Sequence, residues 1–147
     1  MMSLILSFIF AFHCSPDSVQ NPISSICKGY AIIVPTERTN LLMLGVDSIS
    51  KLWIPPDSLI ERGAKFINTH AFEMTQELRS KLCEYYLQIV GIKSDTGLLI
   101  YYNFIHNPPD DWQSHFVFVF GGGENYFHII YDISNDSIKK FYVNSPK

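Results

Sequence analysis

The chain has 147 residues, of which 47% are apolar and 17% are charged, and its formal net charge is −3. This length and composition predict one domain with a hydrophobic core and exclude an intrinsically disordered protein. The negative net charge excludes a broad basic surface for binding nucleic acid.

The N-terminal segment 4–12 is apolar except for Ser7. It is too short to span a bilayer, so no transmembrane span is expected. It has the length of a signal-peptide core, but no Lys or Arg precedes it and no small-x-small cleavage site follows. We expect it to stay uncleaved and favour an intracellular protein; an export signal, an N-terminal anchor and a buried first strand are the alternatives. Residues 15–26 predict a linker, which divides the chain into a segment 1–26 and a domain 27–147.

Short apolar runs predict strands at the start of the domain. Residues 27–35 are rich in β-branched and aromatic side chains and predict a buried strand, with which the apolar run 41–46 can pair as a hairpin. The apolar patch 52–54 ends at Pro55-Pro56, because proline cannot extend a central strand.

Residues 70–86 have the periodicity of an amphipathic helix. At about 100° per residue, one apolar sector lies beside one acidic stripe. The apolar sector contains Ala71, Met74, Leu78, Leu82 and Tyr85. The acidic stripe contains Glu73, Glu77 and Glu84. We expect the apolar sector to pack on a sheet, and the stripe alone is typical of a solvated helix face.

The second half of the chain alternates strands with turns. The runs 87–92, 98–105 and 126–133 predict strands, and the run 115–120 is apolar on both faces, as in a central strand. The glycine-rich stretch 121–125 predicts a hairpin turn rather than a phosphate-binding loop, and residues 134–142 predict a short terminal helix. This order of elements predicts an α/β domain in which helices pack on the faces of a mixed sheet.

The stretch from Lys51 to Leu82 resembles the signature of Nudix hydrolases. The family pattern W-x-x-P-G-G-x-x-E-x-G-E is matched by Trp53, Pro56, Glu61 and Gly63. The family's R-E-h-x-E-E positions fall, without gaps, on Phe72, Glu73, Met74, Thr75, Gln76 and Glu77. The resemblance implies a Nudix-like α/β/α sandwich with a mixed sheet. It also implies hydrolysis of a nucleoside-diphosphate-linked compound with Mg²⁺ or Mn²⁺.

The resemblance further implies roles for individual side chains. Glu73, Gln76 and Glu77 would be the metal ligands, and Glu61, Glu73 and Glu77 would be the catalytic carboxylates. On a helix, Glu73 and Glu77 lie at positions i and i+4, so they can share a cation. Mg²⁺ prefers oxygen ligands, and the bound ion would neutralise phosphate oxygens and activate water.

Several residues depart from the family pattern, and they weaken the expected metal site. The departures are Asp57 and Ser58 near the tandem glycines, and Ala64, Phe72, Gln76 and Arg79 at later positions. A gapped register would place Ser80 and Lys81 at the paired-acid positions, without a metal site. Lys81 also follows Glu77 by four residues and can form an ordinary surface ion pair with it. Weakened or lost catalysis is expected; the alternatives are a non-catalytic Nudix-fold binding or interaction module and an unrelated secreted β-rich domain.

The loop 106–114 contains two prolines, two aspartates and Trp112. Trp112 can stack on a planar group such as a base, which makes a nucleotide-type small molecule the expected partner; alternatively, Trp112 covers the core. The histidines have no metal-ligand spacing. The three cysteines, Cys14, Cys27 and Cys83, lack a CxxC pair and predict reduced thiols, with one disulfide such as Cys14–Cys27 as the alternative in an exported chain.

Overall fold

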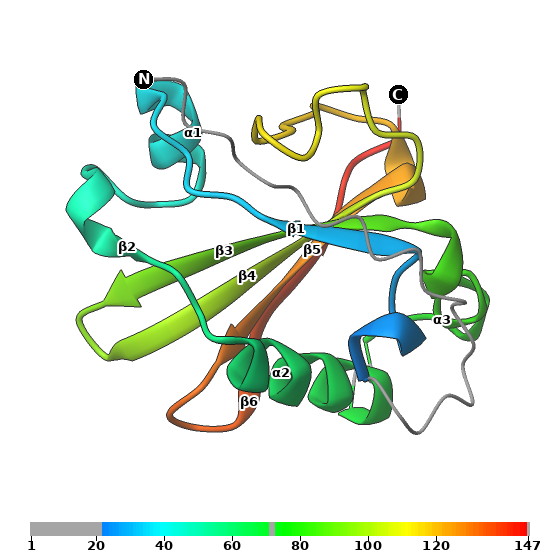
Figure 1. The fold of residues 1–147 in the computed structure, drawn as a ribbon. Coiled ribbons are helices and arrows are strands. Elements are labelled where there is room, and N and C mark those ends of the chain that lie inside the picture. The colour runs from blue at the N-terminus through cyan, green and yellow to red at the C-terminus, as the bar shows by residue number, and fades with distance from the viewer. Residues whose placement is uncertain (1–21, 71–72, 147) are drawn as a thin grey trace, which may run out of the picture.

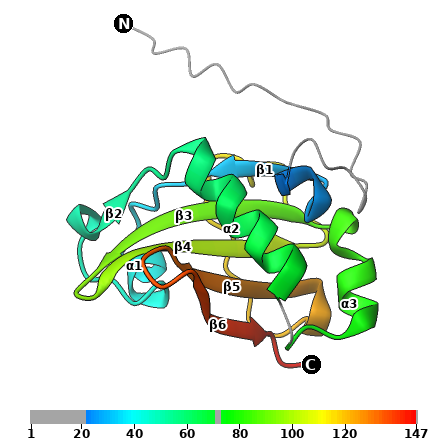
Figure 2. The same cartoon turned by 90° about the horizontal axis from the view of Figure 1, so that it is seen from below.

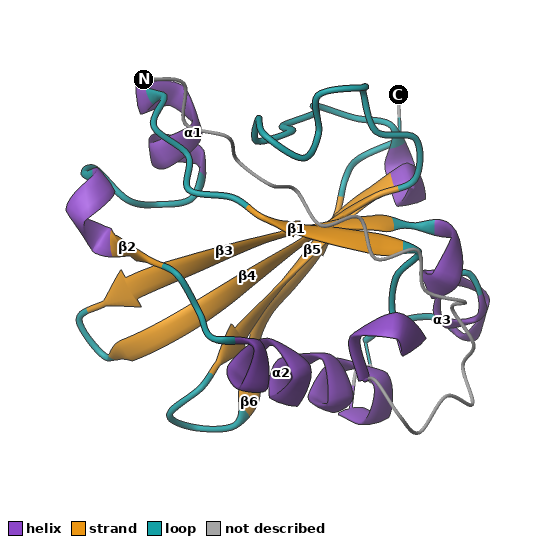
Figure 3. Cartoon of the chain, viewed as in Figure 1, coloured by secondary structure: helices purple, strands orange, loops and turns teal. Residues whose placement is uncertain are grey.

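The computed structural model describes residues 22–70 and 73–146, and it has a mixed α/β fold (Figures 1 and 3). A six-stranded sheet has the order β1-β3-β4-β5-β6, with β2 paired to β3 beside β1. The strands are β1 Gly29–Ile32, β2 Leu52–Trp53, β3 Tyr86–Ser94, β4 Gly97–Ile105, β5 Tyr126–Asp132 and β6 Ser137–Val143. The α-helices are α1 Arg38–Met43, α2 Asp57–His70 and α3 Gln76–Ser80. The 3-10 helices are η1 Pro22–Ser25, η2 Ile49–Lys51, η3 Leu82–Glu84 and η4 Gly123–Asn125. The mixed α/β fold expected from the order of elements is confirmed.

The sheet is mixed because one pair of neighbouring strands is parallel and the others are antiparallel. Strands β3, β4, β5 and β6 pair in chain order as antiparallel neighbours, whereas β1 runs parallel to β3. The predicted strands 87–92, 98–105 and 126–133 are confirmed as β3, β4 and β5, and β1 lies within the predicted run 27–35. Successive side chains of each strand point to opposite faces, so each of the three long central strands contributes to two cores.

Helix α2 packs on the first face of the sheet. Figure 2 shows it crossing the central strands, and its buried side is formed by Ile60, Gly63, Ala64 and Ile67. The strand residues of this core are Leu87, Ile89, Ile100, Tyr102, Phe104, Phe127, Ile129 and Tyr131. Ile23 and Ile26 of the predicted linker are also buried here, so the packed domain begins at η1, before residue 27.

Gly63 lets α2 approach the sheet closely. A Cβ at this position would clash with the Tyr102 hydroxyl and lie 2.9 Å from Tyr131 Cδ1. The Tyr102 hydroxyl donates to the Ile60 carbonyl, one turn earlier in the helix, at 2.8 Å. Burial raises the pKa of Tyr102, which keeps the hydroxyl protonated as a donor.

The second face of the sheet is covered by α1 and by the long connection between β4 and β5. Its core contains Leu41 of α1 and Phe116 of the connection, which pack against Val90 of β3 and Tyr101 of β4. The sheet therefore carries α2 on one face and the short α1 on the other, and neither is a helix that the sequence predicts.

The predicted helix 70–86 is wrong in its extent. The described part contains the last residue of α2, then α3 and η3, and the first residue of β3; α3 and η3 are separated at Lys81, whose backbone leaves the helical region. Residues 71–72, including Ala71 of the apolar sector, lie outside the description. Helix α3 starts late because Thr75 acts as its N-cap and accepts a hydrogen bond from the Leu78 amide at 3.1 Å. The apolar sector is nevertheless correct for four residues, since Met74, Leu78, Leu82 and Tyr85 are all buried.

Three other predicted elements are also wrong. The run 41–46 is largely in helix α1 and its C-terminal turn rather than a strand, and 134–142 contains a turn and most of β6 rather than a helix. The Asp132 carboxylate accepts the amides of Ser134 and Asn135, which turns the chain back so that β6 can pair with β5. The run 115–120 forms no strand; its backbone is held by side chains of the sheet instead.

The cysteines follow the prediction only in part. Cys27 is a buried free thiol whose pKa is raised to about 12 by burial, whereas Cys83 is not free. The apolar segment 4–12 and the site of its expected non-cleavage lie outside the described residues. Within the described residues, no helix has the length and apolar character needed to cross a membrane.

Candidate functional site

The candidate metal and catalytic residues of the Nudix-like motif lie in three different parts of the fold. Glu61 is on α2, Glu73 lies between α2 and α3, and Gln76 and Glu77 begin α3; all four side chains are exposed. Glu77 forms a surface ion pair with Lys81, with Oε1 2.7 Å from Nζ, and this bond lowers the pKa of Glu77. Nowhere in 22–70 or 73–146 do three His, Cys, Asp or Glu side chains gather in a group that could hold a metal ion.

The other motif positions have packing roles. Trp53 lies in β2 opposite Gly91 of β3, where a Cβ at Gly91 would clash with the Trp53 carbonyl oxygen. Pro56 precedes α2, and its carbonyl accepts the amides of Leu59 and Ile60 in the first turn. Trp53 and Pro56 therefore shape the entry into α2.

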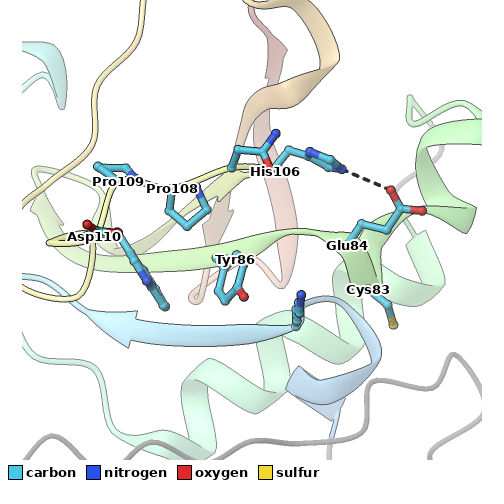
Figure 4. Close-up of a pocket in the computed structure, with 10 residues that line it drawn as sticks. Cys83, Glu84, Tyr86, His106, Pro108, Pro109 and Asp110 are labelled. Carbon is cyan, nitrogen blue, oxygen red and sulfur yellow. Dashed lines mark hydrogen bonds and ion pairs between the residues drawn. The ribbon is translucent and has the colours of Figure 1, made fainter.

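A different cavity, of about 850 Å³, opens at the end of the sheet where β3 begins and β4 ends (Figure 4). It lies beside the second face, because Tyr86 points to the same side as the buried Gln88. Its lining consists of Lys28, Cys83, Glu84, Tyr86, His106, Asn107, Pro108, Pro109, Asp110 and Trp112. Trp112 is the one predicted substrate-binding residue that lines this cavity.

Two aromatic rings form one wall of the cavity. The ring centroids of Tyr86 and Trp112 are 5.1 Å apart, and the planes are tilted by 56°. The Lys28 ammonium lies 5.4 Å from the centroid of the Tyr86 ring, which is within the range of a cation–π contact. A planar apolar surface and a positive charge therefore stand side by side.

Glu84 and His106 form a pair at the other side of the cavity. His106 Nε2 lies 3.2 Å from Glu84 Oε2, and the edge of the imidazole packs against Tyr85, with ring centroids 5.4 Å apart. His106 Nδ1 is buried and has no hydrogen-bond partner among the described residues. In neutral His106 this favours the tautomer in which Nε2–H donates to Glu84, because the proton then has an acceptor.

Tyr85 packs against His106 and holds this pair in place. Its hydroxyl donates to the Glu124 carbonyl at 2.7 Å, and its ring packs edge-on against Phe104 and Phe127. Burial, together with the negative charges of Glu124 and Glu84, raises the pKa of Tyr85 to about 12. The hydroxyl therefore stays protonated and holds the ring against His106.

Buried polar side chains hold the loop that carries Trp112. The Gln88 amide donates to the Trp112 carbonyl at 2.5 Å and to the His115 carbonyl at 2.7 Å, and its oxygen accepts the Val117 amide at 2.8 Å. Asn103 donates to the Val117 carbonyl at 2.8 Å. Gln88 is fully buried, so these bonds are costly to break and keep Trp112 in place.

A second hollow, of about 470 Å³, lies farther along the same face. The His128 ring stacks between Tyr101 and Tyr142, with centroid distances of 4.8 and 5.3 Å. Burial, together with the charge of Lys140, lowers the pKa of His128 to about 4. Phe120, on the connection that also carries Trp112, is 76% exposed at this hollow.

Sequence patterns did not identify Lys28, Tyr86, Glu84 or His106 as members of one site. Glu84 was assigned to a solvated stripe, and His106 had no metal-ligand spacing. The pairing of strands brings them together: Gly29 lies opposite Tyr86, and Tyr86 opposite Ile105. The sequence contains only an indirect signal for this site: polar residues flank the predicted strands at the ends that meet at one edge of the sheet.

Comparison of the chain with models of protein families, with curated proteins and with solved structures finds no match.

Proposed function

We propose that this protein is a non-catalytic binding domain for a small molecule that combines a planar ring with an anionic group. The observation that carries the proposal is that Trp112, Tyr86 and Lys28 line the same cavity. The ring would pack against Trp112 and Tyr86, and the anionic group would lie near the Lys28 ammonium.

The physical basis is a preorganised aromatic surface. Rings that pack against each other contribute about 0.5–1.5 kcal/mol beyond the burial of their area. Gln88 holds the backbone of Trp112, so binding does not have to order this loop. A nucleotide-type molecule and an aromatic amino acid both have the required ring and anionic group.

Calorimetric titration with AMP and with L-tryptophan tests this proposal. We expect at least one of them to bind, and Trp112→Ala to weaken that binding by about 3–10-fold, which corresponds to the loss of one ring contact. Phe120→Ala is the matched control, because it removes an exposed aromatic ring on the same connection but outside this cavity. The proposal fails if neither compound binds, or if Phe120→Ala weakens binding as much as Trp112→Ala.

Hydrolysis is the second proposal: a Nudix-like α/β/α sandwich that cleaves a nucleoside-diphosphate-linked compound with Mg²⁺ or Mn²⁺. The mixed sheet with α1 and α2 on opposite faces supports the fold part of this proposal. The activity part depends on Glu61, Glu73, Gln76 and Glu77. Release of AMP from ADP-ribose in the presence of Mg²⁺ would support it, provided that Glu77→Ala abolishes the release.

A further inference from the structure

We infer that the ligand of the 850 Å³ cavity is a zwitterion with an aromatic ring, of which an aromatic amino acid is the simplest example. Its ring would lie on Trp112 and Tyr86, its carboxylate near Lys28 and its ammonium group on Glu84. This inference rests on the proposed function and names the class of ligand.

The charges around the cavity disfavour a strongly anionic ligand. The charged side chains of the lining are Lys28, with one positive charge, and Glu84 and Asp110, with one negative charge each. A ligand with several negative charges would meet more repulsion than attraction here, because complementary potentials favour binding and like charges oppose it. A ligand with one charge of each sign fits Lys28 and Glu84 together.

Glu84 is prepared to accept a hydrogen bond from a ligand. His106 occupies the Oε2 oxygen of Glu84 at 3.2 Å, and no described residue bonds to the Oε1 oxygen. Figure 4 shows the His106–Glu84 pair at one end of the cavity and Asp110 at the other, with Tyr86 between them. The free oxygen belongs to a carboxylate that is already oriented. Binding an ammonium group there therefore costs little conformational entropy of the Glu84 side chain.

The aromatic and charged parts are ordered along the cavity. Trp112 packs against one side of Tyr86, and Lys28 lies over the ring of Tyr86. Tyr86 lies between Asp110, at one end of the cavity, and Glu84, at the other end. In an amino acid the carboxylate and the ammonium group are attached to one carbon, at the far end from the ring. The order of the ligand groups therefore matches the order of the side chains.

Four probes separate the contributions in calorimetric titrations of the full chain. L-Tryptophan carries the ring and both charges; indole-3-propionate lacks the ammonium group, tryptamine lacks the carboxylate, and AMP replaces the zwitterion with a phosphate. We expect L-tryptophan to bind at least about tenfold more tightly than each of the other three, because each loses a charge-assisted contact.

Variants assign the preference to individual side chains. Glu84→Gln should remove the preference for L-tryptophan over indole-3-propionate, and Lys28→Gln should remove the preference over tryptamine. Glu77→Gln is the control, since Glu77 is an exposed carboxylate outside the cavity lining. It should leave both preferences unchanged.

The outcomes distinguish this inference from the proposed function. If AMP or indole-3-propionate binds as tightly as L-tryptophan and Trp112→Ala weakens that binding, the zwitterion is refuted and the binding domain stands. Preferences that survive Glu84→Gln and Lys28→Gln also refute the inference. If no probe binds the wild-type protein, both the inference and the proposed function fail.

Discussion

Gly63→Ala is expected to destabilise the protein, although alanine is the better helix former. In the interior of a helix, alanine is favoured over glycine by about 0.5–1 kcal/mol. In this protein the added methyl group would clash with the Tyr102 hydroxyl and approach Tyr131 Cδ1 to 2.9 Å. Both tyrosine rings are fully buried, so neither can move into solvent.

The size of the effect follows from three terms. Overpacking a core costs about 1–3 kcal/mol. Moving the Tyr102 hydroxyl away from the Ile60 carbonyl loses a hydrogen bond with a net contribution of about 0.5–1.5 kcal/mol. After the gain in helix propensity is subtracted, we expect a net loss of about 1–3 kcal/mol in the free energy of unfolding.

Urea denaturation of a double-mutant cycle tests this reasoning. Tyr102→Phe removes the oxygen that causes the closest contact, so Gly63→Ala should cost at least about 1 kcal/mol less in that background. Lys65→Ala, on the exposed side of α2, is the control and should change stability by less than about 0.5 kcal/mol. Additive effects of Gly63→Ala and Tyr102→Phe, or a stabilising Gly63→Ala, would refute close packing of α2 at this point.

Three further predictions concern the core, the metal and pH. Leu78→Ala removes a fully buried side chain and should lower the free energy of unfolding by about 2–5 kcal/mol; an unchanged urea midpoint would contradict its place in the core. If the ungapped motif binds Mg²⁺, Gln76→Glu should raise the Mg²⁺ affinity measured by calorimetry, and Glu77→Ala should abolish binding. Equal, negligible heats of Mg²⁺ binding in the wild type and both variants would eliminate a hydrolase centred on these residues. The pKa of His128 is lowered from 6.5 to about 4 in the folded protein. As pH falls, His128 is therefore protonated in the unfolded chain before it is protonated in the folded protein. The stability that His128 contributes above about pH 6.5 is lost as pH falls towards 4. His128→Phe should flatten that part of the stability profile, and NMR titration of the wild-type ring should give a midpoint well below pH 6.

Strands with continuous or alternating apolar residues could be predicted from the sequence, and helices only in part. Strands β3 and β4 are buried on both faces over most of their length, and β5 alternates buried with half-buried residues, so all three are largely apolar runs with clear ends. No helix is predicted for the residues of α2, because Pro55-Pro56 and Gly63 are turn signals when only the local sequence is considered. Gly63 is in fact required by the rings of Tyr102 and Tyr131, which lie far away in the sequence.

The run 115–120 shows why apolar content does not define a strand. Its buried Phe116 packs against Tyr101, but Phe118 and Phe120 are 38% and 76% exposed. The amides and carbonyls that a strand partner would satisfy are bonded instead by Gln88 and by Asn103. No periodicity within the run can reveal hydrogen-bond partners that belong to other strands.

The candidate cavity has the same origin, because pairing between distant segments creates it. Trp112 could be predicted, since an isolated Trp in a loop between strands has few roles other than covering a core or contacting a ligand. The charged residues beside it could not be predicted, since Lys28 and Glu84 are separated in the sequence by most of the first half of the domain. Only the parallel pairing of β1 with β3 places Lys28 beside Tyr86.

The resemblance to the Nudix signature has a packing component that is independent of chemistry. Trp53 faces Gly91, Pro56 precedes the first turn of α2, and Gly63 meets the ring of Tyr102. All three requirements arise from placing a helix closely on a sheet after a short strand, with or without a metal ion. The hydrolase proposal therefore depends on the acidic positions alone. Since Glu77 is engaged by Lys81 on the surface, the response of Mg²⁺ affinity to Gln76→Glu carries more weight than the spacing of the motif.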